Sequence, residues 1–385
     1  MNNNKSKILI VDDEPVNRLI LARSFLEDEY AIFESSSGYE ALTFIDHEVP
    51  DIILLDIMMP GMDGFQVCEK IKNNPKTFDV PILLITALND KQSKLKGLQL
   101  GANDVITKPF DIFEVKLRVK QYLKMRELFL QIKEHNDRMK KEILAARKIQ
   151  LNMLPQPSQH INNEYFFNYE YYPCEDLGGD FLDFSPISSS QYLFYIADVS
   201  GHGVASSLVT VFLKEFFNQY LKKIVINPNP ADILQKLNNA LLAVNFEDKY
   251  MTMFIGILNI VDNIMYWSSA GPNTFPILFN GKNYIELENK APALGWWADI
   301  SFNNYSVEFP HGSSLICYSD AAIEIKNQEN QQLGRNAFID ILIQNKTYES
   351  LDFQQTLHDL LDYGNIINFD DDLTLMGIKR AKASE

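Results

Sequence analysis

Ile8-Leu-Ile-Val-Asp-Asp13 and Ile52-Ile-Leu-Leu-Asp56 decide the fold of the first part of the chain, because each is an apolar run that ends in acids. Helix-like segments separate these runs from three further candidate strands: Tyr30–Glu34, Ile82–Ile85 and Val105–Ile106. Strands that alternate with helices form parallel sheets, and wholly apolar strands suit a sheet covered on both faces. Residues 6–120 are therefore predicted to form a doubly wound α/β domain with a five-stranded parallel sheet.

Polar side chains follow these strands where each one ends. They are Asp12, Asp13, Asp56, Thr86 and Lys108. The carboxyl ends of parallel strands share one edge of the sheet, so we expect these side chains to converge there. As helix caps or a lone surface cation they would have only structural roles, but their common position favours a shared site. Converging carboxylates suit Mg²⁺, and a carboxylate in such a site can attack a phosphoryl group.

Residues 6–125 also resemble the receiver domains of response regulators. The matching motifs are Val11-Asp-Asp-Glu14, Leu55-Asp-Ile-Met-Met-Pro-Gly-Met-Asp-Gly64, Thr86-Ala87 and Lys108-Pro-Phe110. The resemblance implies that Asp56 accepts a phosphoryl group from a cognate histidine kinase, with Thr86 and Lys108 in support. It also implies that Asp12, Asp13, Asp56 and the carbonyl of Met58 bind Mg²⁺. Val105 stands where the family usually has an aromatic residue that moves with the threonine.

A long helix is predicted to follow, because residues 115–154 contain neither Gly nor Pro. Residues in it recur at alternating three- and four-residue spacings, as in a coiled coil: Tyr122, Met125, Phe129, Ile132, Asn136, Met139, Ile143, Ala146, Gln150 and Met153. Residues 114–150 carry eleven Lys/Arg against five Asp/Glu, which suits either nucleic acid or the solvated flank of a coiled coil. The spacing favours the second interpretation. We predict a coiled-coil linker over residues 121–154 that joins two copies of the chain in a homodimer.

Residues 155–380 are predicted to form a second α/β domain with antiparallel sheets. Its candidate strands are close neighbours in sequence, which favours antiparallel pairing: Tyr192–Ala197, Met251–Ile260, Asn263–Ser269, Ser314–Tyr318 and Leu373–Ile378. The candidate helices are Ala205–Lys223, Pro230–Asn245 and Asp352–Tyr363.

Acidic motifs lie beside several of these strands: Gly178-Gly-Asp-Phe-Leu-Asp183, Ala197-Asp-Val-Ser-Gly-His-Gly203, Tyr318-Ser-Asp320 and Phe369-Asp-Asp-Asp372. Oxygen ligands of this kind suit Mg²⁺ or Mn²⁺ rather than zinc. Two such ions about 4 Å apart activate water and hold a phosphoryl group for in-line displacement. His202 is either a general acid or a structural turn residue, and Asp183 is expected to be a surface or capping acid.

Residues 145–380 resemble the PPM family of metal-dependent protein phosphatases, in its SpoIIE/RsbU-like branch. The entry helix Ala145-Ala-Arg-Lys-Ile-Gln-Leu-Asn-Met-Leu-Pro155 is typical of that branch. The resemblance implies an α/β sandwich of antiparallel sheets flanked by helices, and hydrolysis of phosphoserine or phosphothreonine on a partner, often a STAS-type anti-sigma-factor antagonist.

The same resemblance implies the residues of the metal centre. Asp198 bridges two Mn²⁺ or Mg²⁺ ions, the carbonyl of Val199 binds one of them, and Asp320 and Asp371 complete the ligand set with Asp180 in support. The chain departs from the family at Ala321, usually Gly, and at Pro272, usually His.

Composition and charge narrow the alternatives for the partner and the location of the protein. A formal net charge of −16 disfavours nucleic acid as a partner and with it a DNA-binding response regulator. The widely spaced Cys68, Cys174 and Cys317 fit a reducing compartment, and no apolar run of about 20 residues suggests a membrane span. We therefore expect a cytoplasmic enzyme. The competing hypothesis is an adaptor whose phosphatase-like domain binds a phosphoprotein without turnover.

Overall fold

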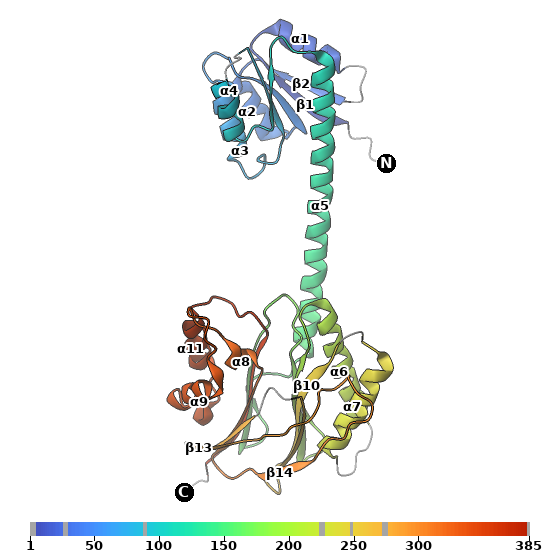
Figure 1. Ribbon diagram of the computed structural model, residues 1–385, viewed down its shortest axis with the longest axis vertical. Coiled ribbons are helices and arrows are strands. Elements are labelled where there is room, and N and C mark those ends of the chain that lie inside the picture. The colour runs from blue at the N-terminus through green and yellow to red at the C-terminus, as the bar shows by residue number, and fades with distance from the viewer. Residues whose placement is uncertain are drawn as a thin grey trace. The chain divides into compact units, whose positions relative to one another are not determined.

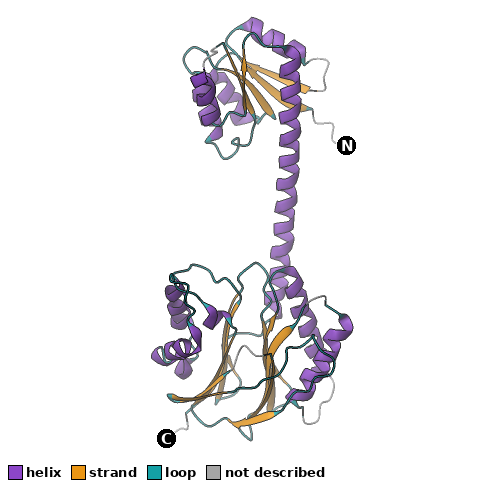
Figure 2. Ribbon diagram, viewed as in Figure 1, coloured by secondary structure: helices purple, strands orange, loops and turns teal. Residues whose placement is uncertain are grey.

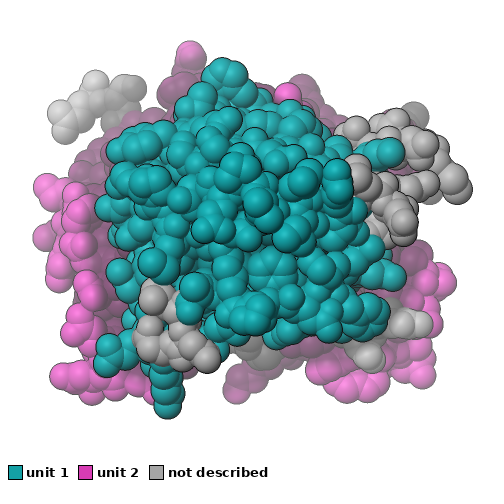
Figure 3. All heavy atoms as spheres, turned by 90° about the horizontal axis from the view of Figure 1, so that it is seen from above, with its two compact units in different colours: residues 1–139 teal, residues 140–385 magenta. Residues whose placement is uncertain are grey.

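The computed structural model describes residues 5–25, 30–87, 91–222, 228–246, 249–271 and 276–382. The chain divides into two compact units, residues 1–139 and residues 140–385 (Figure 3). Pro272, one of the two departures from the family pattern, lies outside the described residues. Within the described ranges, none of the helices combines the length and the apolar character needed to cross a membrane.

The first unit is built on a parallel sheet flanked by helices (Figure 1). The sheet has five strands in the order β2-β1-β3-β4-β5. Its strands are β1 (Ser6–Val11), β2 (Tyr30–Ser35), β3 (Ile52–Asp56), β4 (Ile82–Thr86) and β5 (Asp104–Thr107). Its helices are α1 (Pro15–Ser24), α2 (Gly38–His47), α3 (Gly64–Lys72), α4 (Lys91–Gln99) and the first part of α5 (Ile112–Met153). The predicted doubly wound α/β fold is confirmed.

Both faces of this sheet are buried, which explains why its strands are almost wholly apolar. Ile8 and Ile10 of β1 pack in a cluster with residues of α1 and α5, including Leu21 and Val119. The alternate residues of β1 pack in a second cluster with residues of α2 and α3, such as Val67. The two clusters follow from the alternation of side chains along a strand.

The second unit contains two antiparallel sheets with helices on either side (Figure 2). The first sheet has the order β14-β11-β10-β9-β8: β8 (Phe181–Pro186), β9 (Gln191–Val199), β10 (Met251–Asn259), β11 (Ile264–Ala270) and β14 (Tyr305–Glu308). The second has the order β13-β12-β15-β16-β7-β6: β6 (Gln159–His160), β7 (Tyr165–Tyr172), β12 (Ile277–Asn280), β13 (Asn283–Glu286), β15 (Ser313–Tyr318) and β16 (Leu373–Arg380).

Two groups of helices cover these sheets. One group is α6 (Val204–Lys222) and α7 (Pro230–Val244), and the other is α8 (Ala321–Glu324), α9 (Gly334–Gln344), α10 (Thr347–Ser350) and α11 (Gln354–Gly364). One core cluster joins α6 and α7 to residues of both sheets, for example Phe194 and Met376. A second cluster lies under α8–α11 and includes Phe338. The predicted sandwich of antiparallel sheets flanked by helices is confirmed.

Helix α5 is continuous over 42 residues and takes part in both units. Val115 and Val119 are buried in the core of the first unit, whereas Met153 packs against the core of the second. The division between the units falls within the helix, between Met139 and Lys140. The boundaries expected at 121 and 154 remain predictions.

Candidate functional sites

The first site lies where the strands of the parallel sheet end. Asp12 follows β1, and Asp56 is the last residue of β3. Carboxylate oxygens of Asp12, Asp13 and Asp56 all lie within 4.8 Å of one another. Gly64 lets α3 approach this edge, because a Cβ there would lie 2.2 Å from the carbonyl oxygen of Asp56. The structure therefore brings the three predicted acids together.

Lys108 completes this acidic cluster from the end of β5. Its Nζ lies 2.9 Å from Oδ2 of Asp12 and 2.8 Å from Oδ1 of Asp56. Burial raises the pKa of Asp56, which the ammonium of Lys108 opposes and the charges of Asp12 and Asp13 reinforce. Thr86, the last residue of β4, is fully buried. Met58, by contrast, exposes 57% of its surface two residues after Asp56.

The second site lies at the ends of strands from both antiparallel sheets. Asp180 precedes β8 and is buried, with Thr374 Oγ1 donating to its Oδ2 at 2.6 Å. Asp198 is the penultimate residue of β9, next to the buried Val199. Asp320 immediately precedes α8, and Asp371 precedes β16.

The acids of the second site interact strongly with one another. Burial raises the pKa of Asp198 to about 7, and the charges of Asp320, Asp371 and Asp372 add to that effect. Burial and the charge of Asp198 raise the pKa of Asp180 well above its ordinary value. Without a cation, Asp180 and Asp198 therefore resist ionisation at the pH where an isolated carboxyl group is charged.

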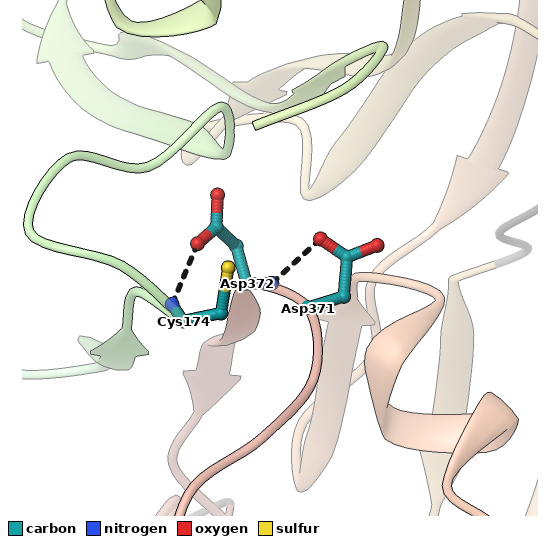
Figure 4. Close-up of side chains that lie close together, drawn as sticks. All are labelled: Cys174, Asp371 and Asp372. Atoms are coloured by element: carbon teal, nitrogen blue, oxygen red, sulfur yellow. Dashed lines mark hydrogen bonds between the residues drawn. The ribbon is translucent and has the colours of Figure 1, made fainter. Parts of the chain in front are cut away.

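Asp372 is a residue that sequence reasoning missed, and its role differs from that of Asp371 (Figure 4). Its Oδ1 accepts a hydrogen bond from the backbone N–H of Cys174 at 2.8 Å, and its Oδ2 accepts one from Gly179 at 2.5 Å. Asp371 instead is exposed, and its Oδ1 accepts from the backbone N–H of Asp372 at 2.8 Å. Asp372 thus holds two chain segments together. A run of three acids in the sequence does not predict this role.

Two further residues of the acidic motifs, Asp183 and His202, pair with charged side chains. The expectation that Asp183 is a surface or capping acid is wrong, because it is 2% exposed and lies 2.8 Å from Nζ of Lys214 on α6. His202 lies at the surface with its Nδ1 2.9 Å from Oε1 of Glu175. Ala321, the other departure from the family pattern, is buried in the core under α8–α11.

The residues at both sites fit the cations that the sequence implies. The predicted ligands are carboxylate and carbonyl oxygens, which suit Mg²⁺ and Mn²⁺. In the second site burial, together with the charges of neighbouring acids, raises the pKa of Asp180 and Asp198, and a bound divalent cation would favour their charged forms.

Comparison with known families assigns both domains. The description "Response regulator receiver domain" matches residues 8–120, and "Stage II sporulation protein E (SpoIIE)" matches residues 188–381, half of the chain. The class is thus a receiver domain followed by a PPM-type phosphatase domain. The chain belongs to the SpoIIE family.

Individual relatives match one part of the chain or the other. The response regulator PleD of Caulobacter vibrioides is 40% identical over 121 residues, which are 31% of this chain and 27% of PleD. The regulatory protein PhoP of Bacillus subtilis, named for alkaline phosphatase synthesis, is 39% identical over 39% of this chain and 60% of PhoP. The chain therefore spans only part of the length of these relatives.

A solved structure supports the fold of the second domain. The SiaA-PP2C domain of Pseudomonas aeruginosa aligns with a TM-score of 0.56 at 20% identity, covering 64% of this chain and 98% of that domain. At this identity the likeness concerns the fold alone.

The raised pKa of Asp198 predicts that metal binding in the second site depends on pH. Below about pH 7 a cation has to displace a proton from Asp198, so Mn²⁺ affinity should rise by about tenfold or more per pH unit between pH 5.5 and 7. Calorimetric Mn²⁺ titrations between pH 5.5 and 8, in buffers of different ionisation enthalpy, measure both the affinity and the protons released. An affinity that is the same at pH 5.5 and pH 8, with no proton release, would contradict this account.

Proposed function

We propose that the chain is a two-component response regulator whose output is metal-dependent dephosphorylation of phosphoserine or phosphothreonine on a partner protein. The observation that supports this most strongly is the presence in one chain of two groups of neighbouring acids, one around Asp56 and one around Asp198. One belongs to a receiver domain and the other to a SpoIIE-family domain, and α5 takes part in both units. A STAS-type anti-sigma-factor antagonist is the partner class that the family resemblance implies.

In the receiver site, Asp56 is the proposed phospho-acceptor. An oxygen of its carboxylate forms the new bond to phosphorus as the bond to the histidine of the kinase breaks. Lys108, which already lies 2.8 Å from Asp56, stabilises the added negative charge. Asp12, Asp13, Asp56 and the carbonyl of Met58 would hold Mg²⁺.

In the phosphatase site, Asp198, Asp320, Asp371, Asp180 and the carbonyl of Val199 would hold two Mn²⁺ or Mg²⁺ ions. Bound ions of this type supply a nucleophilic hydroxide at neutral pH and Lewis-acid stabilisation of the phosphoryl group.

The hydrogen bonds of the protein keep these ligands in place. Thr374 orients Asp180 through its hydroxyl, and Asp372 fixes the backbone of Gly179.

Dimerisation through α5 is the proposed means of coupling. The helix leaves an apolar stripe in solvent, formed by Met125, Phe129, Ile132 and Met139, which are 45–61% exposed. Their heptad spacing suits an identical stripe on a second copy. The ends of the predicted stripe are used within the chain: Tyr122 Oη donates to the carbonyl of Asn103, and Gln150 is buried. The segment left for pairing is therefore 125–146.

Phospho-acceptance can be tested by radiolabelling from a small-molecule phosphodonor. Wild type should be labelled only with Mg²⁺, and Asp56→Asn should abolish labelling. Asp51→Asn is the matched control, since Asp51 lies at the other end of β3 and accepts a hydrogen bond from the backbone of Lys7. Labelling that persists in Asp56→Asn would disprove the assignment.

The phosphatase proposal predicts that Asp198→Asn lowers turnover of a phosphoserine peptide by at least ~10²-fold, the scale of removing one strong electrostatic stabiliser. Activity should require Mn²⁺ or Mg²⁺ and disappear with a chelator. Asp299→Asn, a change at an exposed acid, should leave turnover unchanged. A purified wild-type protein that binds the phosphopeptide without hydrolysing it would support the adaptor hypothesis instead.

The dimer proposal predicts that Asn136→Leu tightens self-association by at least about tenfold, because burying a Leu side chain contributes about 1.5–3 kcal/mol. Lys141→Leu, on the outer side of the same helix by heptad position, should not do so. Sedimentation equilibrium with and without a phosphodonor measures both variants. A wild type that stays monomeric at tens of micromolar in both states would rule out coupling through pairing.

A further inference from the structure

Gln150 is a buried polar side chain near the end of α5, where the heptad pattern predicted a dimer contact. It is only 3% exposed. Its Nε2 donates hydrogen bonds to the carbonyl of Gly178 at 2.8 Å and to Oγ1 of Thr210 at 3.0 Å. The backbone N–H of Gly178 donates in return to Oε1 at 3.3 Å. The amide therefore connects α5 to a loop before β8 and to helix α6.

The loop that Gln150 contacts leads directly to the proposed metal ligands. Gly178 and Gly179 immediately precede Asp180. The carbonyl of Gly179 accepts a hydrogen bond from the backbone N–H of Val199 at 3.3 Å. The backbone N–H groups of Gly179 and Asp180 both point to Oδ2 of Asp372, at 2.5 and 3.3 Å.

This loop has little space in which to adjust. A Cβ added to Gly178 would lie 2.2 Å from Oη of Tyr171 and 2.8 Å from Oδ2 of Asp372. A Cβ on Gly179 would lie 2.8 Å from the carbonyl oxygen of Val199. Tight packing of this kind transmits a displacement to its neighbours instead of absorbing it. A movement of Gly178 therefore displaces Asp180 and the Val199 carbonyl.

The second partner of Gln150 holds its amide in this orientation. The hydroxyl of Thr210 donates to the carbonyl of Ser207 at 2.7 Å, which leaves its oxygen to accept from Gln150. Gln150, Thr210 and Ser207 are all buried, so loss of either partner of Gln150 would leave a buried polar group without a hydrogen bond. The position of α5 and the position of the loop are thereby linked.

We propose that Gln150 is a positioning residue through which the linker helix sets the metal affinity of the phosphatase site. Any rotation or shift of α5 moves the Gln150 amide, and with it Gly178, Asp180 and the carbonyl of Val199. This inference rests on the proposed metal-dependent phosphatase function and gives it a route of regulation. Hydrogen-bonding partners just outside a ligand set commonly alter metal affinity or activity by about 10–100-fold.

The test is a direct Mn²⁺ titration of the full chain by calorimetry. Gln150→Met keeps the length of the side chain and removes the amide, so Mn²⁺ affinity should fall about 10–100-fold. Arg147→Met is the matched control, because Arg147 pairs with Asp176 of the same loop at 3.5 Å, and both side chains are 40% exposed. The control should change the affinity by less than about fivefold.

Thr210→Val is a milder variant in case Gln150→Met folds poorly. It removes one acceptor and should weaken Mn²⁺ binding by about fivefold, the value of one neutral hydrogen bond. Thermal unfolding of each variant shows whether the change is confined to the site. Variants at Gln150 and Thr210 that unfold at lower temperature but bind Mn²⁺ like wild type would overturn the proposal. Because the readout is metal binding, it stands apart from any failure of wild type to hydrolyse a phosphopeptide.

Discussion

Burial of neighbouring carboxylates is the constraint on which both sites depend, because desolvation and mutual repulsion both disfavour the charged form. In the receiver site, the ammonium of Lys108 lies against two of the three acids and offsets part of their charge. In the phosphatase site, Asp372 is satisfied by backbone N–H groups, whereas burial and neighbouring charges raise the pKa of Asp198 to about 7. Asp180 and Asp198 in the second site therefore resist ionisation until a divalent cation takes the place of their protons.

The scaffold around each site explains how the acids are kept in place despite that repulsion. Strands buried on both sides present Asp12 and Asp56 at one edge of a rigid sheet. The phosphatase site instead gathers residues far apart in sequence, and Thr374 and Asp372 reach across to the loop that carries Asp180. Helix α5 meets this loop through Gln150, so the linker that follows the receiver also contributes to the surroundings of the proposed metal site.

Much of the fold could be predicted because buried strands are short apolar runs that end in acids. Strand β10, predicted as Met251–Ile260, spans Met251–Asn259. The strands Tyr165–Tyr172 and Phe181–Pro186 were not predicted, since their aromatic and polar residues carry no clear alternating pattern. The four-residue helices α8 and α10 are too short for a helical period to show.

Site residues could be predicted where an acid stands at the end of a strand. They were harder to predict where a segment far away in the sequence decides the role of the side chain. The burial of Asp183 depends on Lys214, which comes 31 residues later. Gln150 fits the heptad spacing, yet a helix face that pairs with a second copy and one that packs on its own domain have the same period. Only the hydrogen bonds to Gly178 and Thr210 distinguish the two.

We propose that phosphorylation of Asp56 controls the phosphatase domain. The most direct measurement is turnover of a phosphoserine peptide by the full chain with Mn²⁺, before and after treatment with a small-molecule phosphodonor. The account predicts a change of about fivefold or more in wild type, the usual scale of coupling between sites, and none in Asp56→Asn. Equal turnover by phosphorylated and unphosphorylated wild type would contradict it.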